Sequence, residues 1–419
     1  MSAGYTRRAL LGALALAPVL ASATGRRALS APSPAPPAEL LRLAGTCVMT
    51  GWHGQVIPFE VRRLLRRGAL GGVLLTNHNF VTRQGLAALT AAIAAIAPEG
   101  AKPLVSADQE GGPVAHLSPP LSVFPSMTAL GQLDDEDLTH RVGAALGSEL
   151  RSVGVTFDLA PVLDVRTSSS NTVVLNRVFG REPQRVARHG RALIDGLLSA
   201  GVLACAKHFP GHGDTVMDSH VGLPRVAHDL ARLDAVELVP FRACAPIVPA
   251  VMVAHILYTA IDTAAPSSLS RAVVEGLLRQ RVGFDGVAIT DDLQMAAIRA
   301  MHPIERAAEL AMRAGNDMLL IAHTPTLALS AVEHLARTAE HDATLRARLE
   351  EAAARVVRLR ARLDSPIPPN PFPVDPASVV REVARRMVAL GAASRRGGWW
   401  SSTRGASRRW TAPDRGSRT

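Results

Sequence analysis

The sequence lacks the features that define several large classes of protein. Its 419 residues include only three cysteines, Cys47, Cys205 and Cys244, too few for a disulfide framework. We expect all three to be buried as small apolar side chains. After residue 23 no apolar run is long enough to cross a membrane, so no stable membrane span is expected. No glycine-rich nucleotide loop follows the first predicted strand, which disfavours a dinucleotide-binding fold.

Acidic residues are scarce at both ends of the chain, and this accounts for the net charge of +10. Residues 1–37 carry four arginines and no acid, and residues 381–419 carry ten arginines against two acids. The ends therefore contribute +12, which leaves about −2 for the middle of the chain. A near-neutral body gives no electrostatic reason to propose a nucleic acid as partner.

Residues 1–23 have the composition of an export signal. Arg7 and Arg8 precede an apolar run that ends at Leu20, and small residues follow it. Because the paired arginines resemble the twin-arginine type, we expect an exported protein, periplasmic or extracellular. A cytoplasmic protein with a basic leader is the alternative. Residues 24–37 form a proline-rich linker.

Apolar runs alternate with amphipathic segments between residues 38 and 365. The runs predict strands near 43–49, 71–75, 103–107, 155–163, 202–208, 249–255, 286–291 and 316–322. Helical patterns occupy 58–65, 84–97, 136–152, 184–200, 231–243, 271–280, 296–313 and 326–338, with a last one at 344–363. Eight such units predict an α/β fold, a (β/α)8 TIM-type barrel, with an open doubly wound sheet as alternative. For residues 366–419 we expect a linker, one helix over 376–392 and a basic tail, disordered from Gly391 onward.

Titratable residues gather where the predicted strands end, which is where (β/α)8 barrels carry their chemistry. Strand-end positions hold Asp108, Asp164, Lys207, His208, His255 and Asp291. Residues 206–220, after the fifth strand, contain one lysine, three histidines and two aspartates in a loop broken by proline and glycine. A carboxylate at Asp291 has the setting of a glycosidase nucleophile.

A proton donor can be built from Asp218 and His220. In an extended segment residues two apart point the same way, so Asp218 can fix the tautomer of His220 and leave its other nitrogen as a general acid. One alternative is a metal site formed by His208, His212, Asp218 and His220. Pro210, Gly211 and Gly213 argue against the helix that would align the first two histidines. In a second alternative these histidines only stabilise the loop, the favoured interpretation for His212.

These segments resemble the family 3 glycoside hydrolases, specifically the single-domain bacterial β-N-acetylglucosaminidase (β-N-acetylhexosaminidase) branch. Residues 206–220 are similar to the Lys-His-Phe-Pro-Gly-His-Gly and Asp-Ser-His loop of that branch, and residues 277–291 are similar to the nucleophile signature of the family. Residues 108–112, 160–164 and 176–180 also fit in order. The resemblance covers about residues 40–365 and implies one catalytic domain over 38–365.

The resemblance implies a retaining mechanism that needs no metal and no cofactor. Asp291 would be the nucleophile, and His220, oriented by Asp218, would be the acid and then the base. The positions that match sugar contacts of the −1 subsite are Asp108, Arg177, Lys207 and His208. The sequence departs from the family pattern at two places. Residues 113–116 replace a stretch that usually carries arginines, so His116 could supply a sugar contact. Gln294 stands where a small residue is usual.

The expected activity is removal of terminal β-linked GlcNAc from peptidoglycan fragments or chitooligosaccharides. The expected partner is therefore a small glycan, and we expect a monomer. A glycoside phosphorylase or a β-glucosidase of the same family is the alternative with related chemistry. A metal-dependent hydrolase and a non-catalytic glycan-binding protein of the envelope are the alternatives from other classes.

Overall fold

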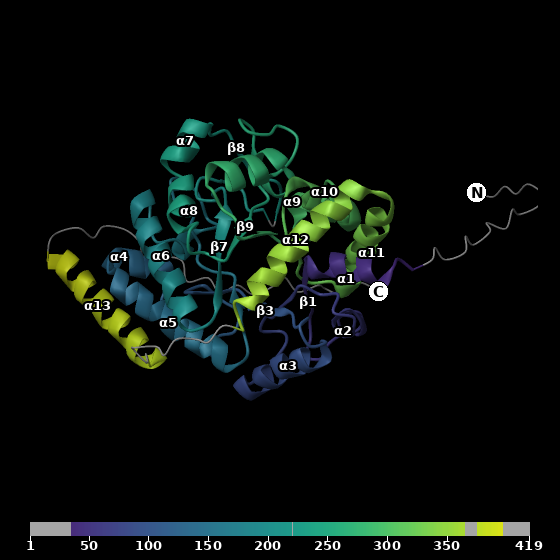
Figure 1. The fold of residues 1–419 in the computed structure, drawn as a ribbon. Coiled ribbons are helices and arrows are strands. Elements are labelled where there is room, and N and C mark those ends of the chain that lie inside the picture. Colours follow the sequence, from purple (N-terminus) through teal and green to yellow (C-terminus); the bar gives the residue numbers. More distant parts are fainter. Residues whose placement is uncertain (1–34, 220, 365–374, 397–419) are drawn as a thin grey trace, which may run out of the picture. The chain divides into compact units, whose positions relative to one another are not determined.

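Eight parallel strands form one sheet in the computed structural model, which describes residues 35–219, 221–364 and 375–396. In spatial order they are β11 (Val287–Thr290), β9 (Ala250–Val253), β7 (Leu203–Phe209), β6 (Phe157–Asp158), β3 (Leu104–Ala107), β2 (Gly72–Leu74), β1 (Val48–Gly51) and β12 (Leu319–Ile321). β11 also meets β12, because the amide of Thr290 donates to the carbonyl of Met318 at 3.0 Å. The sheet therefore closes into a barrel, and the predicted (β/α)8 fold is confirmed (Figure 1).

Helices follow the strands, and several begin where the sequence supplies a capping side chain. Thr82, Asp135 and Asp342 accept hydrogen bonds from first-turn amides of α3 (Arg83–Ile96), α5 (Glu136–Ser152) and α12 (Ala343–Ala361). The remaining helical elements around the barrel are α2 (Phe59–Arg66), α6 (Pro183–Ser199), α7 (Leu230–Ala235), α8 (Leu238–Cys244), η3 (Ala272–Arg281), α9 (Ala296–Arg299), α10 (Ile304–Ala314) and α11 (Pro325–His341).

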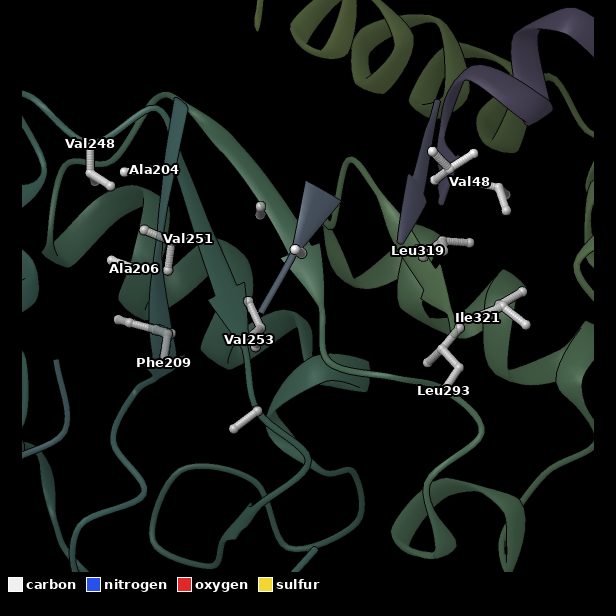
Figure 2. Packing of buried hydrophobic residues seen from close by; sticks show 14 of the residues in the cluster. Val48, Ala204, Ala206, Phe209, Val248, Val251, Val253, Leu293, Leu319 and Ile321 are labelled. Atoms are coloured by element: carbon white, nitrogen blue, oxygen red, sulfur yellow. The ribbon is translucent and has the colours of Figure 1, made fainter. Parts of the chain in front are cut away.

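Side chains along each strand alternate between two apolar layers. On β7, Leu203 and Cys205 belong to a cluster that has members on every strand of the barrel and so fills its interior. Ala204 and Ala206 belong to the larger layer between the sheet and the helices, with Val251 of β9 (Figure 2). Strands covered on both faces are mostly apolar, which is why they appear in the sequence as nearly continuous apolar runs. All three cysteines are buried and free, as expected.

Some predicted elements differ from the structure. The strand expected near 43–49 is wrong over its first half, because Ala38–Thr46 forms helix α1 and β1 begins only at Val48. The helices expected at 231–243 and 296–313 are each two helices, and Pro303 starts the second helix of the latter pair. Helix α4 (Met127–Leu133) was not predicted.

Short elements complete the loops at the carboxyl ends of the barrel strands. They are the antiparallel pair β4 (Gln109–Gly111) and β5 (Val114–Ala115), the parallel pair β8 (Arg225–Val226) and β10 (Leu257–Tyr258), and the turns η1 (Leu175–Arg177) and η2 (Ser267–Leu269). The first pair and η1 carry residues of the candidate site.

A C-terminal helix, α13 (Pro376–Arg396), packs against α4 and α5 (Figure 1). Arg141 of α5 makes a forked contact with Glu382 at 2.6 and 2.9 Å. The helix expected over 376–392 is therefore present, and it continues through Arg396, so the disorder expected from Gly391 onward is wrong for 391–396. The predicted export signal, nearly all of the first linker and the tail after 396 lie outside the described residues. In the part of the chain that the structure describes, no helix has both the length and the apolar character needed to span a membrane.

Candidate active site

Four charged side chains form a buried ion cluster at the carboxyl ends of β3 and β7. Glu110 accepts hydrogen bonds from Nε and a terminal nitrogen of Arg177 at 2.8 and 2.7 Å, and its Oε1 lies 2.7 Å from Lys207 Nζ. Lys207 also pairs with Asp108. Burial raises the pKa of Glu110, but the charges of Arg177 and Lys207 outweigh burial and hold that pKa well below its ordinary value. Glu110 is therefore a permanent anion between two cations.

Asp164, fully buried beyond β6, orients His208. The carboxylate accepts a hydrogen bond from His208 Nδ1 at 2.7 Å and one from the amide of His212 at 2.6 Å. Burial raises the pKa of Asp164, but His208 and these hydrogen bonds outweigh it, so the pKa lies below its ordinary value. When Nδ1 donates to Asp164, Nε2 faces Arg177, whose guanidinium can donate to it at 3.3 Å. His208 is thus held in one tautomer between the cluster and Asp164.

Asp291 and Asp292 follow β11 and have different surroundings. The amide of Asp291 donates to the carbonyl of Val253 in β9 at 2.9 Å, and the amide of Asp292 donates to Oδ1 of Asp291 at 2.8 Å. Asp292 is buried, and its Oδ1 accepts from the amides of Gln294 and Ala322, both at 3.0 Å. Burial raises the pKa of Asp292 to about 6. The second carboxylate therefore fixes the loop that presents the first.

The loop after β7 is held by buried polar contacts. His212 Nδ1 donates to Thr215 Oγ1 at 2.6 Å, and its Nε2 lies 3.3 Å from Ser219 Oγ. A Cβ at Gly213 would lie 1.8 Å from the carbonyl oxygen of Val165, so only glycine fits there. His212 has the loop-stabilising role that the sequence favoured.

The turn expected to carry the acid closes this loop. The carbonyl of Asp218 accepts from the amides of Val221 and Gly222 at 2.9 and 3.1 Å, and the carbonyl of Ser219 accepts from the amide of Ala297 at 3.3 Å. These contacts connect the turn to the start of α9. His220 itself lies outside the described residues.

A cavity of about 350 Å³ opens among these groups at the carboxyl ends of the strands. This volume lies in the range of small-molecule sites. The predicted site residues that line it are Asp108, His116, Arg177, Lys207, His208 and Asp291. Asp218 lies one residue from the lining residue Ser219 and is not itself among the lining residues. A cavity of about 510 Å³ near the amino end of β3 contains none of these residues, and barrel chemistry belongs to the carboxyl ends.

Several residues at this end of the barrel were not assigned by sequence reasoning. Glu110 lies inside the motif that contains Asp108, and Asp164 was noted only as a strand-end residue. Three more lining residues, each in a loop directly after a strand, are His53, His78 and His323. His255 shows the limit of the strand-end signal, because its ring is buried and bonded to Ser268 Oγ at 2.7 Å and to the carbonyl of Asp292 at 2.9 Å.

The histidines of the metal-site alternative that the structure describes are engaged with protein groups. Both ring nitrogens of His208 and both of His212 have the partners given above. Within the described ranges, no group of three His, Cys, Asp or Glu side chains is arranged to hold a metal ion.

The closed barrel and the polar cavity at the carboxyl ends of its strands define a (β/α)8-barrel enzyme. The family model described as the glycosyl hydrolase family 3 N terminal domain matches residues 52–359. The chain therefore belongs to glycoside hydrolase family 3, as the sequence motifs indicated, and is a glycoside hydrolase.

Similar proteins are found among both curated sequences and solved structures. A beta-hexosaminidase of Alkalilimnicola ehrlichii is 37% identical over 295 residues, which cover 69% of this chain and 84% of the relative. The family 3 beta-N-acetylglucosaminidase from Paenibacillus is 34% identical with a TM-score of 0.77, over 83% of this chain and 68% of that one. NagZ from Neisseria gonorrhoeae is 31% identical with a TM-score of 0.62, over 75% and 97%.

Proposed function

We propose that this chain is a retaining exo-β-N-acetylglucosaminidase that removes terminal β-linked GlcNAc from peptidoglycan fragments or chitooligosaccharides. Relatives named beta-hexosaminidase and beta-N-acetylglucosaminidase support this substrate class, as does the complex of the Neisseria NagZ with N-trifluoroacetyl-D-glucosamine. The observation that carries the proposal is the position of Asp291, a strand-end carboxylate in a cavity that the buried ion cluster also lines.

In the proposed reaction Asp291 attacks the anomeric carbon of the terminal sugar. A carboxylate oxygen bonds to that carbon while the bond to the leaving oxygen breaks, and His220 gives the leaving oxygen a proton. Water then attacks the same carbon, His220 takes the proton of the water, and Asp291 is released. Asp218 would hold His220 in the tautomer that can donate this proton. General acid–base catalysis by a side chain such as His220 contributes about 10²–10⁴-fold in rate.

The ion cluster is the proposed binding site for the sugar hydroxyls. Asp108 and Arg177 offer an acceptor and donors at the cavity wall, and Lys207 and His208 lie beside them in buried positions. Because Glu110 and Asp164 fix these side chains, little conformational entropy is lost on binding. His116, an exposed lining residue, is the proposed contact in place of the usual arginines.

We also propose that the enzyme is exported and acts on wall fragments outside the cytoplasm, on the basis of the twin-arginine pattern in residues 1–23. Fractionation of the producing cells, with N-terminal sequencing of the protein, tests this. A processed protein that begins near residue 24 outside the cytoplasm is expected. An intact N-terminus confined to the cytoplasm would contradict it.

The activity test is hydrolysis of an aryl β-N-acetylglucosaminide by wild type, Asp291→Asn and His220→Ala. Asp291→Asn should abolish turnover, because an amide cannot form the glycosyl ester. His220→Ala should lose more activity on poor leaving groups than on good ones, since only poor leaving groups need a proton. Asp285→Asn is the matched control, because Asp285 is 91% exposed and does not line the cavity.

EDTA, phosphate and an aryl glucoside, each tested in the same assay, separate the alternative functions. Activity that survives EDTA excludes a metal-dependent hydrolase. Formation of a sugar 1-phosphate in the presence of phosphate would identify a phosphorylase, and preference for the aryl glucoside would identify a β-glucosidase. A wild-type protein inert toward both substrates would overturn the enzymatic proposal.

A further inference from the structure

A second cavity lies at the amino end of β3, at the opposite end of the barrel from the candidate active site. Its volume of about 510 Å³ also lies in the range of small-molecule sites. Its described lining comes from one face of α3, from the loop between α3 and β3, from the segment that joins α5 to β6, and from the end of α12. None of these residues takes part in the proposed reaction, so we call this space the basal cavity and treat it separately.

Two arginines line the basal cavity, and neither forms an ion pair with any residue that the structure describes: Arg151 and Arg360. Arg360 donates from one terminal nitrogen to the carbonyls of Leu70 and Gly71 at 2.7 and 2.9 Å. Its Nε is buried and has no hydrogen-bond partner within the described ranges. Part of the donor capacity of this guanidinium is therefore unused.

The surroundings of Arg360 differ from those of other arginines on the same helix. Arg348 and Arg355 of α12 both pair with the buried carboxylate of Asp317. Burial lowers the pKa of Arg360 to about 10, because its charge is poorly solvated. The guanidinium still carries its charge at neutral pH, so an anion that enters the basal cavity meets a cation without a carboxylate partner.

Much of the remaining wall is apolar. One face of α3 contributes three alanines, spaced four and three residues apart: Ala87, Ala91 and Ala94. Other apolar lining residues are Pro103, Val105, Val153 and Leu363. Because the alanine side chains are short, this face leaves room for a hydrocarbon chain or a ring beside the two arginines.

The charges of the described wall also favour an anion. Lys102 is the third lining cation and pairs with Glu99 at 3.4 Å, but the side chain of Glu99 is 90% exposed. Asp364 is the other lining acid, and it is exposed as well. Three cations therefore face two acids, and both acids are solvated.

We infer that the basal cavity is a binding site for a small organic anion that has a carboxylate or phosphate head group and an apolar part. Arg360 binds the head group through the donors that residues 70 and 71 leave unused, and Arg151 adds a second positive charge. The alanine face of α3 contacts the apolar part. Both head groups match the planar donors of arginine. This site goes beyond the proposed function, since it lies at the other end of the barrel.

The test is isothermal titration calorimetry of the whole chain with four probes: octanoate, octyl phosphate, octanol and acetate. We expect one of the two octyl anions to bind one-to-one and about tenfold or more tighter than octanol, because hydrogen bonds to a charged group are the stronger ones. Acetate should bind about tenfold or more weakly than octanoate, since it leaves the apolar wall uncovered. The octyl anion that binds more tightly identifies the preferred head group.

Three variants locate the site. Arg360→Gln removes the charge and should weaken binding of the octyl anion about tenfold or more, while octanol binding stays unchanged. Arg358→Gln is the matched control, because Arg358 is an exposed arginine of the same helix that does not line the basal cavity. Ala91→Leu fills part of the cavity without a change in charge, so it should weaken the octyl anion and octanol alike.

A loss of folding in Arg360→Gln would leave Arg151→Gln and a salt titration to decide. In both, the affinity of the octyl anion relative to octanol should fall, because one removes a lining charge and the other screens it. Three results would overturn the inference: no binding of either octyl anion by wild type, octanol binding as tight as that of the anions, or an unchanged ratio in the arginine variants. Hydrolysis of the aryl substrate does not enter this test, so its outcome and that of the proposed function are independent.

Discussion

The buried ion cluster allows the cost of removing one charge to be derived from the structure. In Glu110→Gln, an amide of nearly the same size replaces the carboxylate between Arg177 and Lys207. The side chains of these cations are 15% and 2% exposed, so water cannot replace the lost partner. Only Asp108 remains to face Lys207. Breaking a buried ion pair in this way costs about 3–5 kcal/mol, and the free energy of unfolding should fall by that amount.

Glu382→Gln is the matched control, because Glu382 makes the same forked contact with Arg141. These two side chains are 29% and 35% exposed, and such pairs contribute about 0–1 kcal/mol. Urea denaturation followed by circular dichroism measures both variants. Equal losses in the two variants, or a loss below about 1 kcal/mol for Glu110→Gln, would refute the claim that burial sets the cost.

The pH dependence of the stability of Glu110→Gln tests whether Glu110 is negatively charged in the folded protein. The pKa of Glu110 is lowered in the folded protein, so its contribution is present above the unfolded carboxyl pKa of about 4.3 and is lost as the pH falls through the folded value. The stability difference between wild type and Glu110→Gln should therefore be full at pH 7 and smaller at pH 3. A difference that grows toward pH 3 would contradict this assignment of charge.

Three further predictions concern the loops around the cavity. Asp292 has a pKa raised to about 6, above the unfolded carboxyl value of about 3.9, so the free energy of unfolding should fall as the pH rises between these two values, by at most about 3 kcal/mol. Asp292→Asn should remove this fall, and an unchanged pH profile would contradict it. Gly213→Ala should displace the loop, because the added Cβ would lie 1.8 Å from a carbonyl oxygen. We expect the free energy of unfolding to fall by about 1–3 kcal/mol and kcat/KM to fall as well. Gly276→Ala, with nothing within 4 Å of its Cβ, should show neither effect. Gln294→Ala removes three hydrogen bonds to residues 323 and 324 and should cost about 1–3 kcal/mol, and wild-type stability would show that water replaces them.

The barrel could be predicted because its strands are buried on both faces. Residues 203–206 and 250–253 appear as apolar runs in the sequence since both layers, inside and outside the sheet, are apolar. The same property explains the error at 43–49. Leu40, Leu41 and Ala44 of α1 are buried, and this helix runs almost without interruption into a buried strand. Periodicity alone cannot locate a boundary between two buried elements.

The site was only partly predictable, because sequence reasoning finds residues that follow strands but not the pairs they form. Asp108, Lys207 and Asp291 were found in this way. The pairing of Glu110 with Arg177 joins residues 67 positions apart, and no spacing in the sequence reports it. His53, His78 and His323 were missed as lining residues for the same reason, since each is a single histidine in a separate loop.

The charges of the ion cluster limit what the cavity can bind. In the ion cluster two cations and two anions cancel, and Asp164 and Asp291 add negative charge. A terminal sugar that carries an anion would therefore be repelled where the chemistry takes place. A substrate with a negative charge on its terminal sugar should be cleaved poorly, whatever its leaving group.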